Sequence, residues 1–479
     1  MKQQTFVTLR VFLSLVLVVT AVTSGLMRPH TASSQTSDET RKGKSVVQQE
    51  RVISELGATA DVNLPPQYQI VDIGIVQTGD SASQGFGVSA NGVGVGRSVR
   101  SGGAQAFTWT LSGGIVGLPN ITARPFCVSN GANDNGVVVG TCATTLFGSS
   151  RLPVIWQSGS VSQLPLPSGE TLGDATDVNA TGVAVGSVNG GSLQRGVAYS
   201  GGTATVITQT TSNGSFFVTA FGINDSGRVV GFGIDPNNAA RNVGIVHDIG
   251  SSSAFEVPAL PGLNGALAFG VSNAGHVVGS SMLNQGSGLP FIWSQAGGTV
   301  AIPLAAGTSQ GSARAVNSAG WVVGTDSSAF AIPFLYDGTD TYRLADLIPA
   351  GSGWDLSMNT SSSALGISEG NVIVGTGVFS GSVHAYAMIP VADVSLSGRI
   401  LTAGGAGIRN SLVTVSGGDL PNPVTVQTGS FGYFEFQGLH SGQTYTVTVA
   451  TKRHVIAQPV RMVTLAGNVS DFDFVAEPQ

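Results

Sequence analysis

Short apolar runs alternate with polar turns along most of this chain, in a pattern that occurs seven times. The clearest copy, residues 220–231, reads AFGINDSGRVVG. Asn and Asp side chains bond to backbone groups two residues on, and glycine accepts a positive φ, so the NDSG segment predicts a tight turn. The β-branched Val229 and Val230 then resume an extended strand. The pattern therefore predicts a β-hairpin.

The six other copies share the length of twelve positions and the final glycine. They lie at 85–96, 129–140, 175–186, 268–279, 313–324 and 364–375. The final glycines of successive copies are 44 to 51 residues apart. Each copy is followed by a third short apolar run, aromatic in all but the fourth repeat, and the first six by a fourth strand. Four strands in about 40 to 50 residues predict one blade of a β-propeller.

Two further features favour a closed ring of seven blades. Positions one and three of the motif are mostly Ala or Gly, which lets neighbouring sheets approach closely, while the aromatic third strands fill the wider gaps. The seventh repeat stops near residue 390 without its fourth strand, and a strand of that pattern, residues 68–74, precedes the first repeat. If this strand completes the seventh blade, the ring has no open edge.

The repeat resembles the HAF repeat of bacterial extracellular proteins. That family's pattern is similar to A-x-G-[IV]-N-x-x-G-x-V-V-G, followed by a HAF-W-like strand, and VHAY at 383–386 is the nearest match to its name. The resemblance covers residues 68–390 and implies an extracellular repeat protein. It implies no activity, because the family carries no general one.

The chain begins with a predicted secretory signal at 1–24. Lys2 and Arg10 give the positive start, and residues 11–22 form the apolar run. An uncleaved membrane anchor is the alternative, although this run is short for spanning a bilayer. Residues 25–66 are polar and predict a flexible leader. We therefore expect a secreted or cell-surface protein.

The two cysteines, Cys127 and Cys142, flank the hairpin of the second repeat at equal distances from its turn. In an antiparallel pair this places them opposite each other, and a secreted chain meets an oxidising compartment. The spacing predicts a disulfide that stabilises the fold by about 3 kcal/mol. Two free buried thiols are the alternative.

From residue 392 to residue 479 the period stops and seven short strands are predicted, which favours an immunoglobulin-like or prealbumin-like β-sandwich. The stretches VSLSGR at 394–399 and GSFGYFEF at 429–436 resemble the carboxypeptidase regulatory-like, or Cna-B-like, domain. This resemblance implies a spacer or stalk. The Lys–Asn isopeptide bond of some Cna-B domains is not expected, because the first strand carries Arg399 and the only lysine of the segment is Lys452.

Motifs for catalysis or metal binding are weak. Residues 307–311, GTSQG, match G-x-S-x-G, but that motif needs a strand-to-helix elbow and here lies between two predicted strands. The six histidines lack metal-ligand spacing, and NDNG at 133–136 lacks the further acidic ligands of a calcium loop. The sequence predicts no catalytic residue, no metal and no cofactor.

One motif position suggests a ligand site. The ninth position is Val in four repeats, but it is Arg228, His276 and Trp321 in repeats four to six. Equivalent positions on adjacent blades lie on one rim, where these three side chains would contact an anionic or sugar-like ligand. The alternative is that exposed rim positions vary freely.

Charge excludes nucleic acid as a partner. Residues 65–392 contain nine arginines, no lysine and 16 acidic residues, so this part of the chain is a poor phosphate binder. We expect a non-catalytic binding or interaction scaffold whose extracellular partner is a carbohydrate or an envelope protein. A structural envelope or matrix component, and a propeller enzyme acting on polysaccharide, remain the alternatives.

Overall fold

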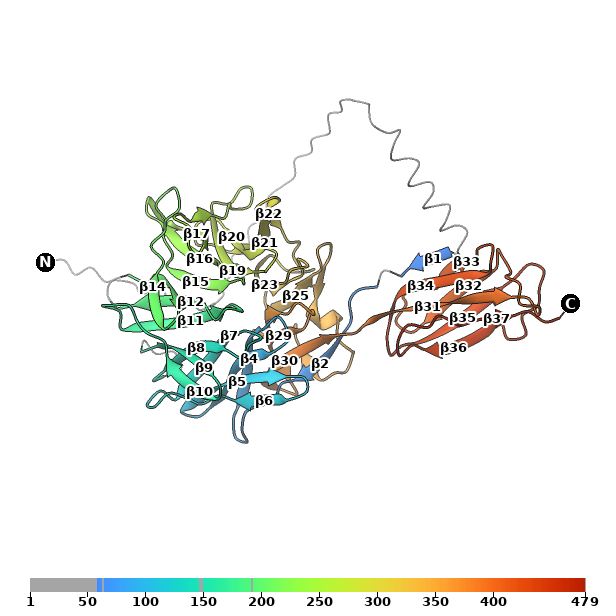
Figure 1. Ribbon diagram of the computed structural model, residues 1–479, viewed down its shortest axis with the longest axis horizontal. Coiled ribbons are helices and arrows are strands. Elements are labelled where there is room, and N and C mark those ends of the chain that lie inside the picture. The colour runs from blue at the N-terminus through green and yellow to red at the C-terminus, as the bar shows by residue number, and fades with distance from the viewer. Residues whose placement is uncertain (1–57, 63, 146–149, 191–192, 479) are drawn as a thin grey trace, which may run out of the picture. The chain divides into compact units, whose positions relative to one another are not determined.

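The computed structural model describes residues 58–62, 64–145, 150–190 and 193–478. The predicted signal at 1–24, and the predicted leader up to residue 57, lie outside these residues. The described chain consists of β-strands and one 3-10 helix, η1 (Leu344–Asp346) (Figure 1). The predicted all-β class is therefore confirmed. No helix within the described ranges has the length and apolar character needed to cross a membrane.

Six repeats form antiparallel sets of four strands paired in chain order, and the seventh set takes its fourth strand from before the first repeat and carries an added two-residue strand, β27 (Trp354–Asp355). The first three sets are β3 (Ala82–Val88) to β6 (Gly114–Gly117), β7 (Phe126–Ala132) to β10 (Ser160–Gln163), and β11 (Leu172–Val178) to β14 (Thr203–Val206). The next three are β15 (Thr219–Ile223) to β18 (Phe255–Glu256), β19 (Gly265–Val271) to β22 (Gly298–Ala301), and β23 (Gln310–Val316) to β26 (Thr341–Arg343). The seventh set contains β28 (Ser363–Ile367), β29 (Ile373–Phe379), β30 (Ser382–Pro390) and β2 (Tyr68–Asp72).

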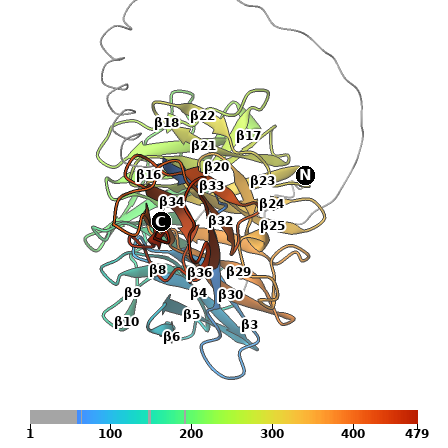
Figure 2. The same cartoon turned by 90° about the vertical axis from the view of Figure 1, so that its right-hand side faces the viewer.

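The first strands of the seven sets contact one another in a closed cycle. The order is β3, β7, β11, β15, β19, β23, β28 and back to β3, and Figure 2 shows successive sets following one another around a centre. Four-stranded sheets arranged radially in this way make a β-propeller. As expected from the sequence, β2 pairs with β30, with Tyr68 opposite Pro390 and Asp72 opposite Tyr386.

Apolar side chains fill each space between consecutive sets. In the space between the fourth and fifth sets, Val230 and Val246 pack with Phe291 and Trp293 of the next repeat. The other six spaces hold equivalent clusters. The third-strand aromatic residues therefore occupy the gaps between sheets. Burial of this apolar surface, rather than one central core, stabilises the ring.

The glycines of the motif lie where the backbone of a neighbour leaves no room for a side chain. A methyl group at Gly231, the twelfth position, would lie 2.0 Å from the carbonyl oxygen of Thr219 on the adjacent strand. At Gly270, the third position, it would lie 2.7 Å from the carbonyl oxygen of Arg314 in the next repeat. Close approach between strands thus explains the glycine at position twelve, and close approach between sheets explains the one at position three.

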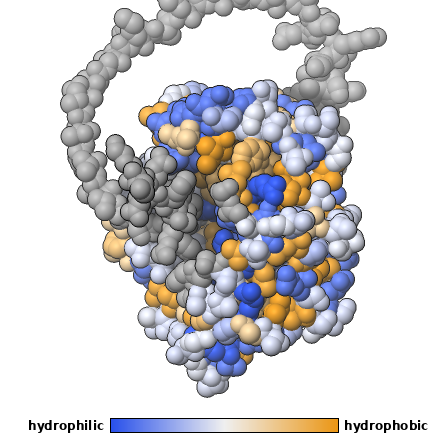
Figure 3. All heavy atoms as spheres, turned by 90° about the vertical axis from the view of Figure 1, so that its left-hand side faces the viewer, coloured by the Kyte–Doolittle hydropathy of each residue, from blue (hydrophilic) through white to orange (hydrophobic). Residues whose placement is uncertain are grey.

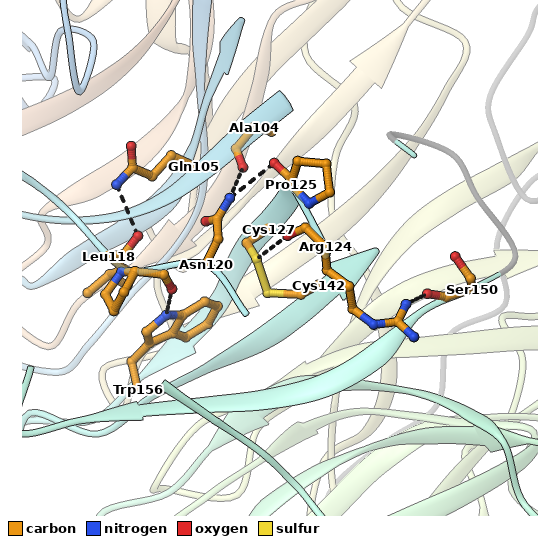
Figure 4. The surroundings of a disulfide bond; sticks show 11 residues. Ala104, Gln105, Leu118, Asn120, Arg124, Pro125, Cys127, Cys142, Ser150 and Trp156 are labelled. Carbon is orange, nitrogen blue, oxygen red and sulfur yellow. Dashed lines mark hydrogen bonds between the residues drawn. A yellow bond between two sulfur atoms is a disulfide. The ribbon is translucent and has the colours of Figure 1, made fainter. Parts of the chain in front are cut away.

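Cys127 and Cys142 lie opposite each other in β7 and β8 (Val138–Ala143) and form the predicted disulfide (Figure 4). The bond lies beside Trp156, whose indole N–H donates to the carbonyl oxygen of Pro119 at 2.7 Å. Both cysteines belong to the apolar cluster between the first and second sets. The disulfide therefore reinforces one hairpin within an inter-sheet core.

The C-terminal segment forms two four-stranded sheets around a separate apolar core. Its strands are β31 (Asp393–Leu401), β32 (Leu412–Gly417), β33 (Val424–Gln427), β34 (Tyr433–His440), β35 (Thr444–Ala450), β36 (Val460–Thr464) and β37 (Phe474–Val475). They coincide with the seven strands expected from the sequence. An eighth strand, β1 (Ala58–Asp61), comes from the predicted leader and pairs in parallel with β34. The stalk function expected for this segment stays a prediction.

Candidate functional site

The ninth motif positions lie at the junctions between repeats. Arg228 donates from Nε and Nη2 to the carboxylate of Asp248, at 2.8 and 3.0 Å. Its Cζ also lies 5.9 Å from the ring centroid of Phe255. The hydrogen bonds from Arg228 hold the pKa of Asp248 below its usual value. The guanidinium is therefore already engaged within its own repeat.

His276 and Trp321 also lie beside the following repeat. The imidazole of His276 lies beside the turn of the sixth repeat, where a methyl group at Gly320 would be 3.7 Å from its Cε1 atom. Trp321 packs against the apolar cluster between the sixth and seventh sets. The structure thus places Arg228, His276 and Trp321 at successive junctions, each against its own surroundings. Ligand binding by this rim stays a prediction.

Hydrogen bonds tie the turns of this rim together. In repeats two, three, four and six the fifth position is Asn, and its Nδ2 donates to the carbonyl oxygen of the fifth residue in the next repeat. These asparagines are Asn133, Asn179, Asn224 and Asn317, with distances of 2.8, 3.2, 2.9 and 3.2 Å. Repeats one, five and seven carry a shorter Ser there. The rim turns therefore have a structural role of their own.

A second motif position departs from regular strand pairing. In all seven repeats the pairing of the first two strands shifts at position two, which makes this residue a β-bulge. A bulge leaves one residue unpaired and changes the direction of its side chain. The seven bulged residues are all half-buried: Phe86, Asn130, Thr176, Phe221, Phe269, Arg314 and Leu365. They line the closed cycle of first strands.

Four side chains form a continuous row across the fourth, fifth and sixth repeats, which we call the inner stack: Phe232, Phe221, Phe269 and Arg314. The ring centroids of Phe232 and Phe221 are 5.6 Å apart, and those of Phe221 and Phe269 are 5.3 Å apart. Cζ of Arg314 lies 4.2 Å from the ring centroid of Phe269. Phe221, Phe269 and Arg314 are bulged residues of β15, β19 and β23, and Phe232 belongs to β16 (Arg228–Asp235).

Arg314 differs from the other arginines of the ring. Of the nine arginines in the range 65–392, it alone has no hydrogen-bond acceptor among the residues that the structure describes. The other eight donate to carboxylates, an amide oxygen or backbone oxygens: Arg97, Arg100, Arg124, Arg151, Arg195, Arg228, Arg241 and Arg343. Arg314 itself is half-buried.

Burial lowers the pKa of Arg314 to about 10, which still leaves the guanidinium charged at neutral pH. A charged group without an acceptor in a partly apolar environment binds an added anion more strongly than a fully solvated one does. The guanidinium lies over the ring of Phe269, and its N–H edge has no acceptor among the described residues. This edge presents parallel donors that match a carboxylate.

A second unpaired polar group belongs to the same repeat. In repeats one and four the side chain one residue after the final glycine contacts the bulged residue: Arg97 lies over Phe86, and Phe232 over Phe221. The equivalent residue in repeat six is Thr325. Its hydroxyl is buried and has no hydrogen-bond partner.

The third repeat contributes a carboxylate to the cycle of first strands. Asp177 occupies motif position three, which is Gly or Ala in every other repeat. Its carboxylate accepts from the backbone N–H groups of Val178 and Ile223, at 2.8 and 2.9 Å. Burial raises the pKa of Asp177 to about 6, so it is ionised at neutral pH. The ring thus carries an acidic and a basic group on strands three repeats apart.

Sequence reasoning missed the inner stack because it treated position two as an ordinary strand residue. A signal is present in the sequence, since position two carries large side chains between two small positions in most repeats. Regular alternation would place such a residue on one face of the sheet, and only the bulge frees it from the strand pairing.

The G-x-S-x-G match has a simple structural explanation. Ser309 donates its backbone N–H to the carbonyl oxygen of Ser327, and the chain then enters β23. Gly307 has a φ of +81°, which belongs to the turn before the strand. The segment is therefore a loop leading into a strand, and it is not the strand-to-helix elbow that the nucleophile motif requires.

Comparisons with known proteins add fold similarity alone. No protein-family model matches the chain, and no curated protein matches it. Among solved structures, virginiamycin B lyase from Staphylococcus aureus is 12% identical with a TM-score of 0.41, covering 68% of this chain and 99% of its own. Oligogalacturonate lyase from Vibrio parahaemolyticus is 11% identical with a TM-score of 0.41, covering 70% of this chain and 98% of its own. YCF48 bound to a D1 peptide is 11% identical with a TM-score of 0.39, covering 69% of this chain and 99% of its own. The fold assignment therefore rests on the strand pairing of the chain itself.

Proposed function

We propose that this protein is a secreted or cell-surface bacterial scaffold that binds an extracellular ligand without catalysing a reaction on it. The ring supplies a rigid frame, and the C-terminal segment serves as a spacer. The observation that carries the proposal is the inner stack, in which a half-buried arginine without an acceptor among the described residues ends a row of half-buried aromatic rings. Such a combination of apolar surface and one oriented polar group is typical of a ligand site.

Each bulged side chain is held by a strand whose neighbours on both sides are fixed. Thr176, for example, donates its hydroxyl to the carbonyl oxygen of Ala220 in the next repeat at 2.8 Å. A preorganised site of this kind loses little conformational entropy on binding. On the face that Figure 3 shows, hydrophilic and hydrophobic residues are interspersed. Recognition on such a surface depends on local groups of side chains.

The test is a binding screen with the mature chain against a glycan array and a set of cell-envelope protein fragments. Three forms are compared: the parent, Arg314→Met, and the rim variant Arg228→Ala/His276→Ala/Trp321→Ala. We expect a ligand that the parent and the folded rim variant bind and that Arg314→Met binds at least about tenfold more weakly.

Loss of binding in the rim variant alone would move the site to the ninth positions. A parent that binds no component of the screen would count against the binding function and favour a structural envelope role. Turnover of a polysaccharide on the array would favour the enzymatic alternative.

A further inference from the structure

We infer that the inner stack binds the C-terminal end of an apolar polypeptide segment, with its single terminal carboxylate on Arg314 and its side chains on the phenylalanine rings. This inference rests on the proposed binding function and names the class of ligand for it.

The guanidinium of Arg314 sets the charge and shape of the group that it takes. One face of the planar group is covered by Phe269, at 4.2 Å from Cζ to the ring centroid. The other face and the N–H edge are the sides left for a ligand, and two parallel N–H groups of that edge fit the two oxygens of one carboxylate.

The phenylalanine rings set the apolar part of the ligand. Phe232, Phe221 and Phe269 are half-buried and lie in contact along one row that ends at Arg314. An apolar ligand that covers the exposed part of these rings is favoured, because removing apolar surface from water lowers the free energy. The row spans three repeats, which is longer than one amino-acid side chain. A segment of several residues covers it better than a small carboxylic acid does.

The remaining charges of the ring argue against a polyanion such as an acidic polysaccharide. Sixteen acidic residues and nine arginines occupy the range 65–392, and eight of those arginines already have acceptors. A chain with many negative charges finds one arginine of the ring without an acceptor, and the net negative charge of the ring opposes its binding. A ligand with a single terminal charge is opposed less.

The experiment uses the mature full-length chain and titrates it with four probes. These are the pentapeptide GAVLF with a free C-terminal carboxylate, the same peptide amidated, N-acetylphenylalanine, and polygalacturonate. We expect the free-acid peptide to bind at least about tenfold more tightly than the amide, because the amide removes the charge that Arg314 receives. We expect N-acetylphenylalanine and polygalacturonate to bind more weakly than the free-acid peptide.

Two variants locate the effect. Arg314→Met should abolish the difference between the acid and the amide, and Arg314→Lys should retain part of it, because a lysine keeps the charge but not the parallel donors. Arg461→Met is a matched control, since Cζ of Arg461 lies 4.1 Å from the ring centroid of Phe472 in the C-terminal segment. This control should bind like the parent.

Equal binding of acid and amide by the parent would overturn the inference without any variant, so it stays testable even if Arg314→Met fails to fold. Equal binding of N-acetylphenylalanine and the peptide would overturn the assignment to a polypeptide end, as would preferential binding of polygalacturonate. If none of the four probes binds but the screen finds another ligand, the inference fails and the proposed function stands. If the screen also finds nothing, both fail.

Discussion

The final glycine of each repeat lies in a crowded position. A methyl group at this site would approach the facing carbonyl oxygen to between 1.8 and 2.2 Å in all seven repeats. Real Cβ atoms do not come so close to backbone oxygens, so the strands would have to separate. These glycines are therefore fixed by the backbone, whatever side chains surround them.

Gly231→Ala should lower the free energy of unfolding by about 2 kcal/mol or more, because its facing carbonyl belongs to a strand that cannot move independently. Gly370→Ala is the matched control, since the nearest atom to its added methyl group is a serine hydroxyl at 3.8 Å. Urea unfolding of the two variants gives the comparison. A Gly231→Ala variant as stable as Gly370→Ala would contradict this account.

Asp326 gives the ring a dependence on pH. Its carboxylate is fully buried in β24 (Val322–Ser327), where Oδ2 accepts from the N–H of Ala305 at 2.8 Å and Oδ1 has no partner. Burial raises the pKa of Asp326 to about 7. The folded protein therefore keeps a proton that the unfolded chain releases near pH 4. The free energy of unfolding should fall as the pH rises from about 4 to about 7.

Asp326→Asn should reduce this fall, since an amide cannot ionise. The parent should lose more stability than the variant between pH 5 and pH 8, on the order of a few kcal/mol. Thermal or urea unfolding at the two pH values measures the difference, with the exposed Asp340→Asn as a control for the loss of one charge. If the parent and Asp326→Asn lose equal amounts of stability between the two pH values, another group controls the pH response.

At the scale of elements, the hairpin turns carry two kinds of hydrogen bond. In the fourth repeat, Oδ1 of Asn224 accepts from the N–H of Arg228 within the turn, and Nδ2 donates to the carbonyl oxygen of Ser272 in the next repeat. Repeats with Ser at this position keep the first bond only, as Ser272 does with the N–H of His276. The turn and the link between repeats can therefore be separated by substitution.

Asn224→Ser should preserve the turn and lose the link to the fifth repeat, which costs about 1 kcal/mol of stability. Asn224→Ala removes both bonds and should cost more. Chemical denaturation of both variants tests the order. If Asn224→Ser costs as much as Asn224→Ala, the inter-repeat hydrogen bond carries the whole effect and the turn acceptor is dispensable.

Most elements were predictable from the sequence, because hairpins depend on residue types that are close together in the chain. Turn residues such as Asn224 and Gly227, together with β-branched runs, set the strands within a few residues, and the opposition of Cys127 and Cys142 followed from the same register. The bulges did not follow, since a bulge depends on how a strand pairs and not on one residue type. The sequence therefore predicts a ligand site at the ninth position, which stays a prediction, and does not single out Arg314 at position two.

At the scale of the whole molecule, closure of the ring depends on β2, the strand that precedes the first repeat. β2 supplies the strand that would otherwise be missing from the seventh set, and the buried Tyr68 packs in the cluster between the sixth and seventh sets. His384 contacts both carboxylate oxygens of Asp72 across this pairing, with Nδ1 at 2.9 and 3.1 Å. Without β2, the strand β30 becomes an exposed edge.

A chain that begins at residue 74, and so lacks β2, should unfold at a lower temperature and self-associate through the open edge. A chain that begins at Gln67 keeps β2 and is the matched control, since both lack β1. Thermal unfolding and light scattering of the two chains give the comparison. Equal melting temperatures and equal monomer content would show that closure by β2 is dispensable.

The pairing of Asp72 with His384, 312 residues apart, also sets the order of events during synthesis. β2 is the first strand of the ring to be synthesised, and its partner β30 is the last. β30 follows roughly 15 to 60 s later at ordinary elongation rates. During this interval the nascent chain holds a growing row of blades with two unprotected ends.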